Sequence, residues 1–401
     1  MNNTYASLDP VPVSVPTEKH LRRNRTFQGI PGIERTASGR LFAVWYGGGT
    51  LECAENYVML VCSDDDGVTW SEPVAVVDPA NHFVRAFDST LWISPNGRFY
   101  WFWAQSSGVS CARLWEPSYD GIAGVFYSFL ENPDAPPDQF CFSPSVRIAN
   151  GIMMNKPTVL QDGTWCLPTS VWTGKEWLRH PHLAVSPGCY LTVSTDWGAS
   201  FHTRGRIEMS GAEVTPTFDE HMFVELADGK LECFIRVGEG VAEAFSSDQG
   251  ATWSKPILST RVRGPNSRFF IKQLRSGRRL MINHDMAQSA ERSQTRDRLT
   301  AYLSDDEGQS WPYQLLLDER AEVSYPDARE GENGLIYIVY DRLRTNGGFI
   351  HMAKITEADI IAGKLVGSKS QLQMEIDHSN PVGMVNPVDG YRITGGRPTE
   401  A

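Results

Sequence analysis

The 401-residue sequence has few cysteines and no long apolar run. Its seven cysteines are scattered and never spaced as CxxC, so we expect buried free thiols in a reducing compartment and no cysteine zinc site. No stretch approaches about 18 consecutive apolar residues, which excludes a transmembrane helix. The first twenty residues carry acidic and proline residues instead of the basic start and apolar run of a secretory signal. We therefore expect a cytoplasmic protein.

Positive charge and several catalytic motifs are also scarce. The chain has 37 Lys and Arg against 48 Asp and Glu, a net charge of −11, and no basic run longer than Arg22-Arg23. Nucleic acids and anionic membranes attract basic surfaces, so neither is expected as a partner. The motifs G-x-S-x-G and H-E-x-x-H are absent, and Gly47-Gly48-Gly49 lacks the lysine of a phosphate loop. No metal or cofactor is expected.

An eight-residue pattern, S-x-D-x-G-x-[ST]-[WF], recurs four times, beginning at Ser63, Ser194, Ser246 and Ser304. Each copy follows a short apolar segment typical of a β-strand. Ser and Asp side chains accept hydrogen bonds from backbone N–H groups, Gly adopts a positive φ, and the aromatic residue packs against a sheet. The pattern therefore predicts a turn between two strands.

Strand-rich segments with x-x-G turns fill the sequence between these repeats. They form six groups, over residues 30–78, 84–148, 155–206, 218–260, 267–318 and 323–356. These groups predict an all-β fold, a six-bladed β-propeller over residues 26–360. Residues 1–25 are expected to be an N-terminal extension, and residues 361–401 a tail too polar for a seventh blade. A short helix is expected at residues 356–364.

The octapeptide resembles the Asp-box, or BNR repeat, of the sialidase superfamily, and the resemblance covers nearly the whole chain. It implies a sialidase-like propeller in which the Asp-boxes are structural turns away from the catalytic face. Four further segments are similar to those of BNR-repeat neuraminidase-like proteins, at residues 47–52, 155–157, 265–267 and 324–326. They fall in four different blades, so we expect them to meet at the central channel.

The resemblance also implies catalytic groups. Sialidases use a tyrosine nucleophile activated by a glutamate, an aspartic acid/base and three arginines that hold the substrate carboxylate. Tyr325 lies where the family places its nucleophile, and the segment from Glu220 to Arg236 is similar to the one from the activating glutamate to the second arginine. A phenol with a pKa near 10 is a poor nucleophile without such a base.

Two positions depart from the family pattern. The first arginine belongs to an R-I-P motif, but this chain reads Q-G-I-P at residues 28–31, with Gly29 in place of the arginine. Arg25, Arg85 and Arg268 are candidates to replace it. The acid/base aspartate is not evident either, and we expect Glu52 to take its role, since partial burial can raise the pKa of a glutamate.

Further candidate residues precede the inner strands of other blades. His82, a possible general base near neutral pH, stands just ahead of the second blade together with Arg85 and Asp88. Residues that head the third and fifth blades are expected to contact substrate hydroxyl or carboxylate groups. These residues are Asn155, Lys156, Asn266 and Arg268.

The leading hypothesis is a sialidase-like exo-glycoside hydrolase that removes a terminal acidic sugar from a short oligosaccharide. An alternative is a propeller lyase that cleaves beside a uronate with His82, Tyr325, Arg85 and Lys156. A second alternative is a glycan-binding propeller without catalysis, because a fold does not determine function. All three readings predict an oligosaccharide partner.

Overall fold

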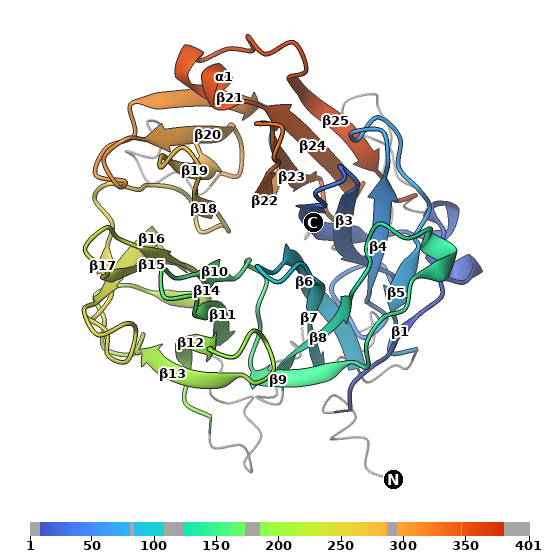
Figure 1. Cartoon of the computed structure of the whole chain (residues 1–401), viewed down its shortest axis with the longest axis horizontal. Helices are drawn as coiled ribbons and strands as arrows, with labels where there is room; N and C mark the ends of the chain where they lie inside the picture. The colour runs from blue at the N-terminus through green and yellow to red at the C-terminus, as the bar shows by residue number, and fades with distance from the viewer. Residues whose placement is uncertain are drawn as a thin grey trace, which may run out of the picture.

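Six antiparallel β-sheets form a ring around a central axis in the computed structural model (Figure 1). The structure describes residues 9–80, 84–107, 123–172, 185–286, 295–345 and 347–380. In five sheets, four strands follow in chain order from the inner strand near the axis to the outer strand at the rim. The first sheet has a fifth strand, β1, beside its outer strand β5. This arrangement confirms the predicted six-bladed propeller.

The strands are distributed over the sheets as follows. The first sheet contains β1 (Val13–Ser14), β2 (Gln28–Arg35), β3 (Leu41–Gly47), β4 (Tyr57–Ser63) and β5 (Ala75–Val77). The second contains β6 (Val84–Ile93), β7 (Phe99–Ser107), β8 (Gly124–Leu130) and β9 (Val146–Asn150). The third contains β10 (Thr158–Val159), β11 (Trp165–Val171), β12 (Gly188–Ser194) and β13 (His202–Ile207).

The remaining sheets complete the ring. The fourth contains β14 (Pro216–Glu225), β15 (Leu231–Val237), β16 (Gly240–Ser246) and β17 (Ile257–Leu258). The fifth contains β18 (Phe270–Gln273), β19 (Arg279–His284), β20 (Leu299–Ser304) and β21 (Tyr313–Asp318). The sixth contains β22 (Val323–Glu330), β23 (Ile336–Arg342), β24 (Phe349–Ile355) and β25 (Gln371–Asp377). Short 3-10 helices lie at η2 (Glu18–His20), η3 (Arg22–Asn24) and η4 (Pro137–Gln139).

The four predicted turns each join the third strand of a sheet to the fourth. In the copy that begins at Ser246, its hydroxyl accepts a hydrogen bond from Gly250 N at 2.8 Å, and Asp248 Oδ1 accepts one from Thr252 N at 2.9 Å. Gly250 has a φ of 88°. The hydroxyl and amide of Thr252 lower the pKa of Asp248 to about 2. The same bonds recur in the other three copies, so the predicted turn chemistry is confirmed.

Four of the six inner strands carry a β-bulge in their first half. At each bulge one residue other than glycine adopts a positive φ: Ile30 at 59°, Asp88 at 43°, Asp219 at 52° and Tyr325 at 56°. Bulges redirect side chains, and such backbone strain is common at functional sites. Because the third strand of a blade runs parallel to the inner strand, the Asp-boxes that follow it lie at the opposite end from the bulges.

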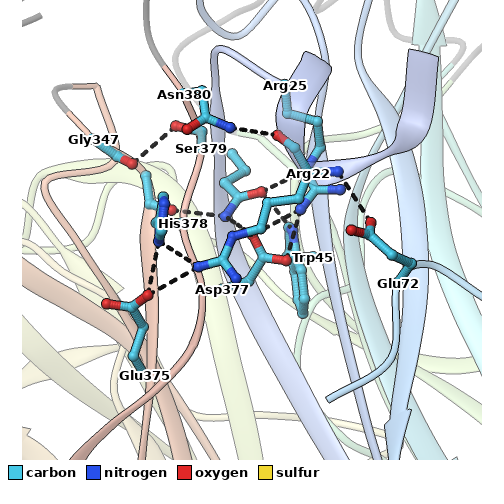
Figure 2. A network of polar contacts seen from close by, with 12 residues as sticks. Arg22, Arg25, Trp45, Glu72, Gly347, Glu375, Asp377, His378, Ser379 and Asn380 are labelled. Atoms are coloured by element: carbon cyan, nitrogen blue, oxygen red, sulfur yellow. Dashed lines mark hydrogen bonds and ion pairs between the residues drawn. The ribbon is translucent and has the colours of Figure 1, made fainter. Parts of the chain in front are cut away.

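Residues 22–25 and the strand β25, near the two ends of the described chain, are joined by hydrogen bonds and ion pairs (Figure 2). Arg25 Nη2 donates to both carboxylate oxygens of Asp377 at 2.7 Å, and Arg22 Nη2 donates to Glu375 Oε1 at 3.0 Å. Both acidic residues lie on β25, the outer strand of the sixth sheet. The propeller therefore extends beyond the expected boundaries of residues 26 and 360, because β1 and β25 also pair with blades. An outer strand needs one buried face only, so a polar segment can supply it.

The expected helix is present as α1 (Glu357–Ala362). The Thr356 side chain accepts a hydrogen bond from Asp359 N at its start, and Gly363 ends it with a φ of 65°. Within the described residues, no helix is long and apolar enough to span a membrane.

The cysteines differ in part from the expectation. Cys53 takes part in a disulfide bond, so the prediction that all seven are free thiols is wrong for this residue. Cys141 is free but exposed, and the other free cysteines of the described chain are buried: Cys62, Cys166, Cys189 and Cys233. The expected cytoplasmic location stays a prediction.

Candidate functional site

Tyr325 lies at the bulge of β22 and is 6% exposed. Its hydroxyl oxygen accepts a hydrogen bond from Arg236 Nη1 at 3.1 Å, and the same nitrogen donates to Glu220 Oε1 at 2.8 Å. Glu220 Oε2 is buried and has no hydrogen-bond partner among the described residues. One guanidinium group thus joins the expected nucleophile to its expected base.

Arg236 is held in a fixed orientation at the end of β15. Its Nε donates to Asn266 Oδ1 at 2.6 Å, and its Nη2 donates to the Asn266 carbonyl oxygen at 3.1 Å. The Phe218 ring lies 4.6 Å from its guanidinium carbon. Burial lowers the pKa of Arg236, but Glu220 and Tyr325 outweigh this effect and raise it, so the group stays charged. Asn266 therefore positions Arg236 in this structure.

Two further arginines lie against the Tyr325 ring. The guanidinium carbon of Arg344, in the turn after β23, is 4.5 Å from the ring centroid, and that of Arg296 is 5.4 Å away. Arg296 Nη2 also donates to the Asn266 carbonyl oxygen at 3.0 Å. Together with Arg236, these residues place three positive charges around one phenol. The arrangement favours an anionic ligand.

Glu52 lies in the loop between β3 and β4 and is about half exposed, with 47% of its side chain accessible. The Tyr46 hydroxyl donates to its Oε1 at 3.1 Å, and Arg344 Nε lies 3.8 Å from the same oxygen. Desolvation raises the pKa of Glu52, but Arg344, Arg85 and the Tyr46 hydrogen bond together lower it. Glu52 is therefore ionised near neutral pH, which is unfavourable for a proton donor.

Asp88 lies at the bulge of β6 and is 4% exposed. In contrast to Glu52, its surroundings raise its pKa. Desolvation and the negative charges of Glu220 and Glu52 outweigh the favourable effect of Arg85 and Arg344 and raise the pKa of Asp88 to about 7. A carboxyl group with this pKa exchanges protons near neutral pH.

Arg85 precedes Asp88 on the same strand. Its guanidinium carbon lies 4.0 Å from the Phe87 ring centroid and 5.4 Å from that of Tyr46. Its Nε and Nη2 are buried without a hydrogen-bond partner in the described part of the chain. Arg85 therefore keeps donor groups available near Glu52 and Asp88.

Asn155, Lys156 and Arg268 bind the protein itself. Lys156 Nζ donates to the carbonyl oxygens of Ile33 and Leu91 and lies 3.2 Å from Asp327 Oδ2. Arg268 Nε donates to Asn155 Oδ1 at 2.7 Å, and its two Nη atoms donate to the carbonyl oxygens of Pro31 and Met154. These bonds tie inner strands together across the axis. Their expected contact with substrate stays a prediction, and the structure favours a structural role.

The sequence pattern of the BNR repeat-like domain family matches residues 39–338, which is well over half of the chain. The chain belongs to this family. No curated protein matches the sequence.

Solved structures with the same fold include sialidases. The Hadza microbial sialidase Hz136 is 17% identical with a TM-score of 0.60, over 80% of this chain and 64% of that one. The intramolecular trans-sialidase from Ruminococcus gnavus, solved with oseltamivir carboxylate, is 12% identical with a TM-score of 0.61, over 85% and 96% of the two chains. The Trypanosoma rangeli sialidase, solved with sialic acid, is 16% identical with a TM-score of 0.57, over 83% and 55%. These likenesses show a sialidase-like propeller fold.

The structure of this BNR repeat-like protein brings together Tyr325, Glu220, Arg236 and Asn266, while Glu52, Arg85 and Asp88 approach the same group. The expected base His82 lies outside the described residues. Within those residues, no group of three or more His, Cys, Asp or Glu is suited to hold a metal ion.

Sequence reasoning missed three residues near Tyr325. They are Tyr46, Arg296 and Arg344. Tyr46 lies within an apolar strand, where an aromatic residue is expected for packing alone. Arg296 and Arg344 lie in segments between strands, where no motif of the sequence distinguishes them from the other arginines.

Proposed function

We propose that the protein is a sialidase-like exo-glycoside hydrolase that removes a terminal acidic sugar from a short oligosaccharide. One observation carries this proposal: Arg236 Nη1 donates hydrogen bonds to both the buried Tyr325 hydroxyl and the Glu220 carboxylate. The guanidinium groups of Arg296 and Arg344 lie against the Tyr325 ring. A phenol, a carboxylate and a cluster of guanidinium groups are the parts needed for covalent attack on an acidic sugar.

Tyr325 Oη attacks the anomeric carbon, and the bond from this carbon to the leaving oxygen breaks. Glu220 takes the phenolic proton, after a rotation or through a water, since its free Oε2 is the available acceptor. Arg236 Nη1 stabilises the negative charge that develops on the phenolic oxygen. Water then attacks the glycosyl-tyrosine, and the Glu220 proton returns to the phenol. Two successive displacements retain the anomeric configuration.

Asp88 is the better donor of the proton to the leaving oxygen, and it takes the place of Glu52 in this scheme. A carboxyl group with a pKa of about 7 is protonated in a large fraction of molecules near neutral pH, whereas the pKa of Glu52 is lowered. After the first displacement Asp88 is a carboxylate and accepts a proton from the attacking water. Glu52 instead orients Tyr46 and balances the charge of the arginines.

Arg236 and Arg296 bind the acid group of the sugar. Both guanidinium groups are held by Asn266, which reduces the entropy lost on binding. Asn266, Glu220 and Tyr325 occupy four of the five N–H groups of Arg236, so Arg236 offers the acid group one Nη2–H and its positive charge.

The test is incubation with a panel of short sialylated and uronate-containing oligosaccharides, followed by mass spectrometry and ultraviolet absorbance. Hydrolysis gives products whose masses sum to the substrate plus one water. Tyr325→Phe should lower kcat by at least about 10³-fold at unchanged thermal stability, because the nucleophile is lost and the ring is kept. Tyr313→Phe, a half-buried tyrosine of the outer strand β21, is the matched control.

Other outcomes of the same panel separate the alternatives. An unsaturated, ultraviolet-absorbing product formed without added water would replace hydrolysis by elimination. Binding without turnover that Tyr325→Phe barely weakens would indicate a glycan-binding propeller.

A further inference from the structure

The space beside Gly29 is filled by an arginine from the other end of the chain. A Cβ atom on Gly29 would lie 2.3 Å from Arg344 Cδ and 2.4 Å from Arg344 Cγ. Gly29 has no positive φ, so the backbone itself would accept a side chain. A side chain at residue 29 and the observed Arg344 therefore exclude one another. This is the position where the R-I-P motif carries its arginine.

The guanidinium group of Arg344 has unused hydrogen-bond donors. Its Nε lies 3.8 Å from Glu52 Oε1 and its Nη1 lies 3.9 Å from Asp341 Oδ2, both too far for a hydrogen bond. Both nitrogens are buried without a hydrogen-bond partner in the described chain. Leaving buried charged donors unsatisfied is costly, so an acceptor is expected in the working state.

Asp341 lies beside Arg344 and accepts no hydrogen bond from its Nε or Nη1. Asp341 Oδ2 accepts a hydrogen bond from Ile30 N at 2.9 Å, and its Oδ1 accepts one from the Ser324 hydroxyl at 2.7 Å. The nearby carboxylate raises the pKa of Arg344 against the effect of burial, which keeps it charged. Asp341 thus holds the bulges of β2 and β22 together and places a charge beside Arg344.

Other arginines named from the sequence are less suited to this place. Arg25 is bound to Asp377, and Arg268 is bound to Asn155 and to two carbonyl oxygens. Arg85 lies over Phe87, on the second sheet.

We propose that Arg344 replaces the arginine that is absent at residue 29 in the carboxylate clamp, the group of arginines that bind the substrate carboxylate. Arg344 then selects sugars with an acid group next to the anomeric carbon. The inference rests on the proposed function for its substrate class. Arg344 reaches the face of Tyr325 from the loop after β23, whereas an arginine at residue 29 would approach from β2. The clamp is therefore composed of Arg236, Arg296 and Arg344.

The experiment makes two comparisons between an acid and its methyl ester. Hydrolysis rates are measured for an aryl glycoside of sialic acid and for the methyl ester of this glycoside. Affinities are measured by titration calorimetry for free sialic acid and for its methyl ester. Arg344→Met should lower kcat/KM and affinity for the acid by about 10- to 100-fold and change both values for the ester little, since charge-assisted bonds are lost. Arg344→Lys should recover part of the lost affinity and kcat/KM for the acid, because it restores the positive charge without the paired N–H donors of a guanidinium group. Arg342→Met, at the last residue of β23 and two positions before Arg344, is the control, and thermal unfolding checks that each variant folds.

An exchange variant tests the position itself. Arg344→Ala removes the two nearest atoms from the space beside Gly29, and Asp341 Oδ2, 2.9 Å from an added Cβ atom, must then shift slightly. The double variant Gly29→Arg/Arg344→Ala should regain at least about tenfold in acid preference over Arg344→Ala alone. A folded double variant with no regain would contradict the shared position.

The outcomes separate the inference from the proposed function. Equal losses for acid and ester in Arg344→Met would overturn the inference and leave hydrolysis intact, since Arg344 would then only position Tyr325. Binding of the acid without hydrolysis, with the predicted loss in Arg344→Met, would overturn the proposed function and support the clamp. Absence of both binding and hydrolysis in the unaltered protein would overturn both.

Discussion

Replacing Asp88 by Asn should stabilise the protein at alkaline pH. The same replacement should remove the proposed hydrolytic activity. The folded-state pKa of Asp88 is about 7, against 3.8 for an ordinary aspartate. A carboxyl group whose pKa is raised by folding favours the folded state below its unfolded pKa, and this contribution is lost as the pH rises through the folded pKa.

The magnitude follows from the two pKa values. Complete ionisation of the buried Asp88 lowers the free energy of unfolding by about 4 kcal/mol, of which about 2 to 3 kcal/mol falls between about pH 5 and about pH 8. Asn has nearly the shape of a protonated Asp but does not ionise. The stability gained by Asp88→Asn should therefore be about 2 to 3 kcal/mol larger at pH 8 than at pH 5.

Urea denaturation of both proteins at the two pH values measures this difference. Asp138→Asn, at an exposed carboxylate, is the control and should show no such pH dependence. In Asp88→Asn, kcat of the proposed hydrolysis should fall by about 10²- to 10⁴-fold, and the decline in rate that the proposed mechanism predicts for the unaltered protein above about pH 7 should disappear. A stability difference that is the same at both pH values would refute the assignment of a raised pKa to Asp88.

Two further predictions concern buried charges. Arg25→Met leaves the Asp377 carboxylate without the guanidinium nitrogen that donates to both its oxygens (Figure 2) and should lower the free energy of unfolding by about 3 to 5 kcal/mol, measured by urea denaturation, with little change in KM. Lys156→Met leaves Asp327 without its nearest cation and should destabilise the protein by a similar amount, about 3 to 5 kcal/mol. If Lys156→Met instead raised KM at unchanged stability, the expected contact with substrate would be supported.

The sequence predicted those features that depend on neighbouring residues. The four Asp-box turns follow from Ser, Asp and Gly within eight positions, because these residues satisfy one another locally. Their spacing and the hairpins between them were enough for six blades. The boundaries were less accurate, since β25 is polar and becomes a strand only by pairing with β24.

Resemblance to sialidases was enough to select Tyr325, Glu220 and Arg236, which the structure joins through one nitrogen of Arg236. For Asn155, Lys156 and Arg268 the expected contact with substrate stays a prediction, and the structure shows their contacts within the protein. A lysine at the start of an inner strand has the same sequence signature whether it points to a ligand or to backbone carbonyl oxygens across the axis. Only the packed ring shows that Lys156 is surrounded by Ile33, Leu91 and Asp327.

By itself, the sequence determined the turns and the blade count, because these depend on local hydrogen bonding, and the resemblance to sialidases selected Tyr325, Glu220 and Arg236. The tertiary structure alone decided the bulges that aim Asp88 and Tyr325, the raised pKa of Asp88, and the filling of the space beside Gly29 by Arg344. The physical reason is that closing the propeller brings the first and last blades together. Steric exclusion and charge interactions between residues at opposite ends of the chain arise only then.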